Sequence, residues 1–101
     1  MRDISHGVFP YSLTTGGLRA ALPAARVPDR RYPAPVEMTA YLVARFDPSA
    51  VIADTTLLDH EALRITTGVA PTPADRDRAA ALDGRLEQTG SRWTITVPTT
   101  G

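Results

Sequence analysis

The stretch LRITTGVAPTPADRDRAAALDGRLEQTGSRWTITV, residues 63–97, has the clearest local signals in the chain. At its start, Leu63 and Ile65 alternate with polar neighbours, and at its end Trp93, Ile95 and Val97 do the same. Alternation with a period of two is typical of a strand that is buried on one face. The pattern therefore predicts strands at 63–67 and 92–97. In the second strand, Arg92, Thr94 and Thr96 fall on the polar face.

The segment between these strands has the signals of a helix start. The Thr72 hydroxyl can accept a hydrogen bond from the free N–H of Asp75, and Pro73 occupies a position where the missing N–H costs nothing. Gly90 is suited to the left-handed conformation that often ends a helix. We therefore predict a helix over 73–89.

The apolar stripe of this predicted helix is thin. It consists of Ala79, Leu82 and Leu86, and Gly84 lies inside it at a cost of about 1 kcal/mol relative to alanine. Two strands flanking one helix form a βαβ unit, whose crossover should be right-handed. With so little apolar surface, the helix must depend on its neighbours.

The composition limits the functional classes that fit. The chain has 101 residues and no net charge, with eleven acidic and eleven basic residues, all eleven basic ones arginine. We predict one domain over 1–101. A neutral chain argues against nucleic acid as the partner, because binding to a polyanion needs a basic excess. The absence of lysine and cysteine excludes lysine and cysteine nucleophiles, disulfides and thiolate metal sites.

Hydropathy gives no membrane signal. No segment approaches the ~18 consecutive apolar residues of a membrane span. Residues 1–6 lack the apolar core of a signal peptide, so a cytoplasmic location is the expectation. No motif for a cofactor or a metal ion is present, and we predict neither.

The first third of the chain has weaker signals. Residues 4–13 have the apolar content of a short strand, but Pro10 reduces the prediction to an edge strand or an irregular arm over 1–12. A short helix is expected at 18–22. Three prolines and three arginines make 26–35 a connection on the surface.

Residues 36–46 allow two interpretations. Met38, Leu42 and Phe46 belong to an alternating series that fits a long strand, whereas Val36 and Val43 also lie on one side of a possible helix. The cleaner period of two favours the strand. The apolar run 50–53 is either a strand or a turn of helix.

Taken in order, these elements predict an α+β fold. A single small domain with a split βαβ (ferredoxin-like) sheet and its helices on one face is the commonest way to arrange strand, helix, strand, strand, helix, strand. Its outer strands would leave sheet edges free to pair with another chain.

The densest group of titratable residues is Asp59, His60 and Glu61, followed by Arg64. Asp59 and His60 are candidates for acid–base catalysis, and Arg64 is a candidate for binding an anionic ligand through its planar guanidinium. Consecutive residues of an extended chain point to opposite faces, so a solvated turn and an ordinary salt bridge are the competing interpretations.

Two other groups suggest ligand binding. Arg26, Arg30, Arg31 and Tyr32 resemble a contact for a nucleic-acid backbone, but Asp29 lies among them. The sequence at 15–17, Thr-Gly-Gly, precedes the short predicted helix and can be either an anion cradle or a plain turn.

The function expected from the sequence is a small protein–protein interaction or assembly module. It would be an accessory or regulatory subunit, oligomeric or bound to a protein partner through a sheet edge or an apolar face. The alternative is a small enzyme or anion-binding domain that uses Asp59, His60 and Arg64.

Overall fold

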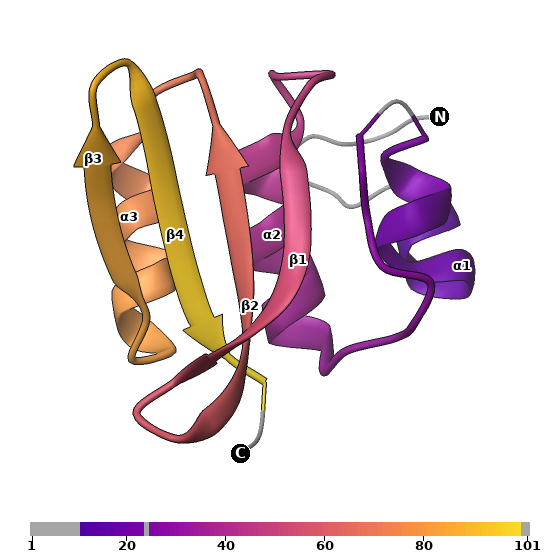
Figure 1. The fold of residues 1–101 in the computed structure, drawn as a ribbon. Coiled ribbons are helices and arrows are strands. Elements are labelled where there is room, and N and C mark those ends of the chain that lie inside the picture. The colour runs from indigo at the N-terminus through magenta and orange to yellow at the C-terminus, as the bar shows by residue number, and fades with distance from the viewer. Residues whose placement is uncertain (1–10, 24, 100–101) are drawn as a thin grey trace.

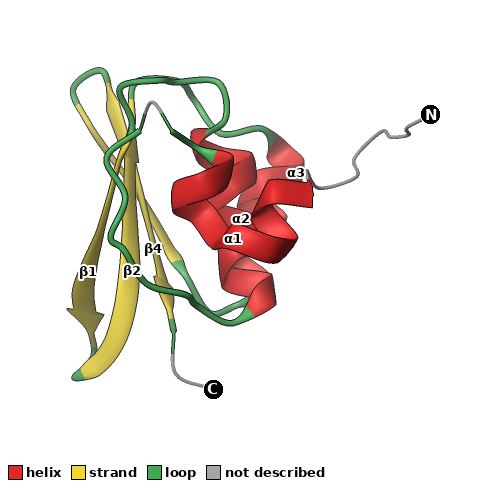
Figure 2. Ribbon diagram, turned by 90° about the vertical axis from the view of Figure 1, so that its right-hand side faces the viewer, coloured by secondary structure: helices red, strands yellow, loops and turns green. Residues whose placement is uncertain are grey.

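A four-stranded antiparallel sheet with three helices on one of its faces makes up the fold (Figures 1 and 2). The computed structural model describes residues 11–23 and 25–99. The elements in chain order are α1 (Tyr11–Ala21), α2 (Ala34–Ala44), β1 (Val51–Leu57), β2 (His60–Thr67), α3 (Pro73–Ala81), β3 (Arg85–Thr89) and β4 (Arg92–Pro98). The prediction of an α+β fold is confirmed. Among the described helices, none has the length and apolar character that crossing a membrane requires.

The sheet is built from two hairpins joined at its centre. Its strand order is β1-β2-β4-β3, with β2 and β4 paired in antiparallel orientation. Ile65 lies opposite Ile52 on one side and Ile95 on the other, and Leu63 lies opposite Val97. The two strands expected at 63–67 and 92–97 are therefore confirmed, and they form the middle of the sheet.

The ferredoxin-like order predicted from the sequence is not confirmed. The elements follow one another as two helices, a hairpin, a helix and a second hairpin. Because β2 and β4 are antiparallel neighbours, and α3 leads from β2 to the far edge strand β3, the predicted βαβ unit is absent from the described residues. The two strands were correct, but the connection between them was not.

The helix predicted over 73–89 begins as expected and ends early. The Thr72 hydroxyl accepts from the Asp75 N–H at 3.1 Å, but α3 stops at Ala81. Gly84 then donates its N–H to the Ala79 carbonyl at 2.8 Å, after Asp83 adopts a positive φ of 60°. This closing turn, and not Gly90, ends the helix. Residues 85–89 form β3.

The interpretation of 36–46 as a strand is wrong, because Ala34–Ala44 is the helix α2. Pro33 occupies its N-cap position, with another proline in the first helical turn. The helix contacts α1, α3 and β2, so it buries side chains on most of its circumference. The apolar residues that resembled one face of a strand are the result of this central position.

The first third also differs from the prediction. Residues 1–10, which include most of the proposed strand at 4–13 and of the arm at 1–12, lie outside the described residues. Residues 11 and 12 belong to α1, which includes the helical segment expected at 18–22 up to Ala21. The proline-rich connection 26–35 runs beside β1 until α2 begins at Ala34 (Figure 1).

The core lies between the helices and the covered face of the sheet. Leu18, Ala40, Leu63, Ile65, Ile95 and Val97 have no measurable exposure. Burying a leucine, isoleucine or valine side chain stabilises a fold by roughly 1.5–3 kcal/mol. The central strands β2 and β4 therefore hold the three helices in place, and the opposite face of the sheet is left without a helical layer (Figure 2).

Candidate functional site

The face of the sheet that no described helix covers is the most extended candidate surface. Strand alternation turns Leu63, Ile65 and Thr67 of β2 toward the helices, so the residues between them lie on the other side. We call this side the open face. It is formed by Val51, Ala53, Thr55, Leu57, His60, Ala62, Arg64, Thr66, Arg85, Glu87, Thr89, Arg92, Thr94, Thr96 and Pro98.

Arg64 lies near the centre of the open face. The strand register sets it between Ala53 of β1 and Thr96 of β4, and Thr96 in turn lies opposite Arg85 of β3. Arg64 is exposed, and within the described part of the chain it forms no ion pair. The Arg64 guanidinium is therefore accessible from solvent on the open face.

The other two predicted site residues do not converge with Arg64. Asp59 lies in the two-residue turn between β1 and β2, with a φ of 67°, and His60 begins β2 opposite Leu57. His60 and Arg64 share the open face but are four residues apart, which is about 13 Å along a strand. No group of three or more potential metal ligands occurs among the described residues. The three residues therefore do not form a compact catalytic group.

Sequence reasoning missed Arg85 as a residue of this surface because it placed 85–89 in a helix. The signal was present: two short runs with strand-like residues flank Gly90 and Ser91, which is the spacing of a β-hairpin. In the structure Glu87 pairs with Thr94, and both lie on the open face. The polar face predicted for 92–97 becomes part of the same surface.

A polar cluster covers the outer edge of β1. The Tyr32 hydroxyl donates to Asp54 Oδ1 at 2.7 Å, and the Arg30 guanidinium lies 4.8 Å from the Tyr32 ring centre. Arg30 also approaches Asp54 and Glu61 at 3.7 and 3.9 Å. Burial, followed by the hydrogen bond to Asp54, raises the pKa of Tyr32 above its usual value. The phenol therefore stays protonated, and its hydrogen bond to Asp54 holds the connection 26–35 against β1.

Three of the four residues of the proposed nucleic-acid contact, all but Arg26, make internal interactions. Arg30 is engaged as above, Arg31 pairs with Glu37, and Tyr32 is buried. The Arg31 Nη1 also donates to the Thr15 carbonyl at 3.3 Å. The segment 15–17 belongs to α1, and its backbone approaches the ion pair between Arg31 and Glu37.

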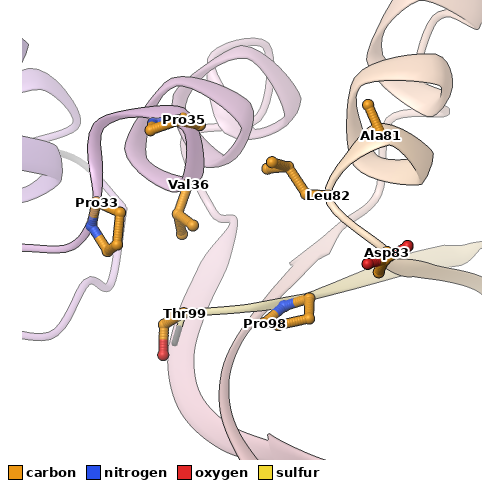
Figure 3. A pocket seen from close by; sticks show the side chains of 8 residues that line it. All are labelled: Pro33, Pro35, Val36, Ala81, Leu82, Asp83, Pro98 and Thr99. Carbon is orange, nitrogen blue, oxygen red and sulfur yellow. The ribbon is translucent and has the colours of Figure 1, made fainter. Parts of the chain in front are cut away.

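A pocket of about 360 Å³ lies between the start of α2, the end of α3 and the end of β4 (Figure 3). It is lined by Pro33, Pro35, Val36, Ala81, Leu82, Asp83, Pro98 and Thr99. Asp83 is the one ionisable side chain in this lining. The other seven residues of the lining carry no ionisable side chain, so the pocket is a small, mostly apolar depression with one carboxylate.

Comparison with known proteins gives no assignment. The chain matches no protein-family model, no curated protein and no solved structure.

Proposed function

We propose that this chain is a protein–protein interaction module, an accessory or regulatory subunit that binds its partner through the open face of the sheet. The observation that carries the proposal is the placement of all three described helices on one side of a four-stranded sheet (Figure 2). Antiparallel sheets can leave one face in water, but an extended surface of this kind also suits a second protein.

The open face is a better docking surface than either edge. At β1, Arg26 bridges Val51: the Arg26 N–H donates to the Ala50 carbonyl at 3.2 Å, and its carbonyl accepts from the Ile52 N–H at 2.7 Å. The other edge, β3, has five residues and includes Arg85 and Glu87. Short, charged edge strands resist pairing with another chain. These features favour contact through the open face over pairing through a sheet edge, which is one of the two modes expected from the sequence.

Large exposed apolar side chains do not form an alternative docking patch. Phe46, Leu58 and Val69 are the large exposed apolar residues of the described chain. Leu58 lies in the turn between β1 and β2, whereas Phe46 precedes β1 and Val69 follows β2, at the opposite ends of these strands. Phe46 and Val69 lie on either side of the hydrogen bond between Asp47 and Gly68, and Leu58 lies at the far end of the strands. This small apolar pair offers less surface than the sheet face does.

The second candidate is a small anion-binding domain. The position of Arg64, exposed and without an ion pair among the described residues, favours it. The separation of Arg64 from Asp59 and His60 weighs against an enzyme built on all three. Substitution of His60 by alanine would leave ligand binding unchanged under this candidate, and substitution of Arg64 would abolish it.

A bulky substitution on the open face tests the interaction module. Thr94 is half-buried at the centre of the face, between Thr66 of β2 and Glu87 of β3. Tryptophan has a high strand propensity, so Thr94→Trp should preserve the strand. Its bulky side chain should obstruct a partner that contacts the open face. The same change at Thr56, exposed on the other side of β1, is the matched control.

The expected result is a mass above the monomer that depends on the open face. We expect a stoichiometric assembly, with itself or with a protein from the native host, that Thr56→Trp retains and Thr94→Trp loses, at unchanged melting temperature. Analytical ultracentrifugation and tagged co-purification measure both. A strict monomer at high concentration, with no partner that responds to Thr94→Trp, would refute the proposal.

A further inference from the structure

We propose that the partner surface recognised by the open face is acidic, and that Arg64, Arg85 and Arg92 bind its carboxylates. This inference rests on the proposed function and specifies the chemistry of the partner. A guanidinium presents several N–H donors in one plane and matches the two oxygens of a carboxylate.

Charge is segregated on the open face although the whole chain is neutral. The face has three arginines and one carboxylate, that of Glu87, among its described residues. A surface with one predominant sign attracts a partner of the opposite sign and increases the rate of association. The open face can therefore attract an acidic partner although the whole chain has no net charge.

Arginines elsewhere in the described chain are mostly engaged by their own fold. Four form ion pairs, namely Arg19, Arg30, Arg31 and Arg78. Two others, Arg45 and Arg76, lie over the aromatic rings of Phe46 and Trp93. In contrast, none of the three arginines of the open face forms an ion pair or a ring contact within the described residues.

The surroundings of these arginines provide further hydrogen-bonding groups. Arg64 and Arg85 lie on either side of Thr96, in one row across the sheet. Strands are spaced about 4.8 Å apart, so their backbones are separated by roughly 10 Å. Threonine hydroxyls at 55, 66, 94 and 96 lie around this row. Two carboxylates of an extended acidic segment can therefore reach the two guanidinium groups.

The same face is poorly suited to single-stranded nucleic acid. Recognition of single strands on a sheet depends on aromatic side chains on which the bases stack. The described residues of the open face include no aromatic residue, because Trp93 lies on the covered face beneath Arg76. An acidic protein segment needs only the charged and hydroxyl groups that are present.

Binding of poly-L-glutamate to the full chain tests the inference. At low ionic strength we expect labelled poly-L-glutamate to bind and poly-L-lysine not to bind. Arg64→Gln and Arg85→Gln should each weaken the binding by roughly two- to fivefold, the range of one exposed ion pair. Glu87→Gln should strengthen it, because this change removes the carboxylate that competes for the arginines. Fluorescence anisotropy measures each affinity.

Arg26→Gln is the matched control. Arg26 is exposed and has no ion pair among the described residues, but it lies beside the edge of β1 and not on the open face. Arg26→Gln should bind poly-L-glutamate as the wild type does. Circular dichroism melting of every variant checks that each one is folded.

Three outcomes would overturn the inference: no binding of poly-L-glutamate, an equal loss in Arg26→Gln and Arg64→Gln, or tighter binding of polyuridylate with the same dependence on the variants. Its failure is distinguishable from failure of the proposed function. If Thr94→Trp abolishes binding of a native partner while poly-L-glutamate does not bind, the proposed docking surface is supported. The proposed preference for an acidic partner is then wrong. If Thr94→Trp also has no effect on assembly, both fail.

Discussion

Arg31 holds the buried carboxylate of Glu37 through two parallel hydrogen bonds, from Nε to Oε2 at 2.9 Å and from Nη2 to Oε1 at 3.1 Å. The Tyr32 N–H also donates to Glu37 Oε2, at 3.1 Å. The side chain of Glu37 is 4% exposed, and that of Arg31 is 52% exposed. One carboxylate therefore joins the first turn of α2 to the connection that precedes it. Gly17 allows this approach, since a Cβ there would lie 2.6 Å from Arg31 Cδ.

Glu37→Ala should lower the free energy of unfolding by about 2–3 kcal/mol, because it leaves the Tyr32 N–H without its acceptor and removes the two hydrogen bonds between Arg31 and Glu37. Urea denaturation measures the change. Asp29→Ala is the control: Asp29 pairs with Arg19 at 3.5 Å where both side chains are mostly exposed, so its loss should cost less than about 1 kcal/mol. Equal losses in the two variants would contradict this account.

The lowered pKa of Asp47 makes the free energy of unfolding depend on pH in the acid range. Its carboxylate accepts from the Gly68 N–H at 2.8 Å and from the Ser49 N–H and hydroxyl at 2.9 and 2.7 Å. These hydrogen bonds, that of Gly68 first, lower the pKa of Asp47 to about 2, from 3.8 ordinarily. Because the pKa is lower in the folded state, the stabilisation is fully present above the unfolded pKa and is lost as the pH falls through about 2.

The expected contribution of the Asp47 carboxylate is on the order of 2 kcal/mol. Asp47→Asn should lose this contribution at neutral pH and should show a flatter stability profile below pH of about 4. Denaturation at a series of pH values measures both effects. Asp29→Asn, at an exposed position, should keep the wild-type profile. An unchanged acid dependence in Asp47→Asn would show that other carboxylates control it.

Gly84 lies where the chain turns from α3 into β3, in a space that excludes a side chain. A Cβ there would lie 2.7 Å from Val97 Cγ1 and 2.9 Å from the carbonyl oxygens of Ala79 and Thr96. Backbone atoms of a helix and a central strand cannot move aside cheaply, so Gly84→Ala should destabilise the fold by roughly 1–3 kcal/mol. At Gly68 the nearest atom would be 3.6 Å away, and Gly68→Ala should be close to neutral. Thermal melting of the two variants compares them directly.

Leu58 has a left-handed backbone conformation that is unfavourable for leucine. It and Asp59 form the two-residue turn between β1 and β2, with φ angles of 53° and 67°, and Leu58 is 74% exposed. Turns of this type favour asparagine and glycine, because a left-handed conformation costs most other residues roughly 1–2 kcal/mol. Leu58→Asn should therefore raise the melting temperature. The same change at Leu57, half-buried in β1, should lower it; a decrease in both variants would contradict the explanation from strain.

The residues of the open face show how much of the candidate site could be predicted from the sequence. The pattern from Arg92 to Val97 and that from Leu63 to Thr67 correctly assigned Arg64, Arg92 and Thr96 to the polar side of two strands. It did not indicate that these strands are neighbours or that Arg85 lies in the same row as Arg64. That neighbourhood depends on contacts between residues far apart in the chain, which local patterns do not encode.

Local signals in the sequence were sufficient to predict the two central strands, because their alternation follows from burial on one face. They were also sufficient for the start of α3, where Thr72 satisfies a free N–H. Long-range packing was needed to establish that 36–46 belongs mainly to a helix, because burial between α1, α3 and the sheet removes the polar face that would reveal the helical period. It also decided where α3 ends, since Gly84 must pass close to Val97 of a strand that follows later in the chain.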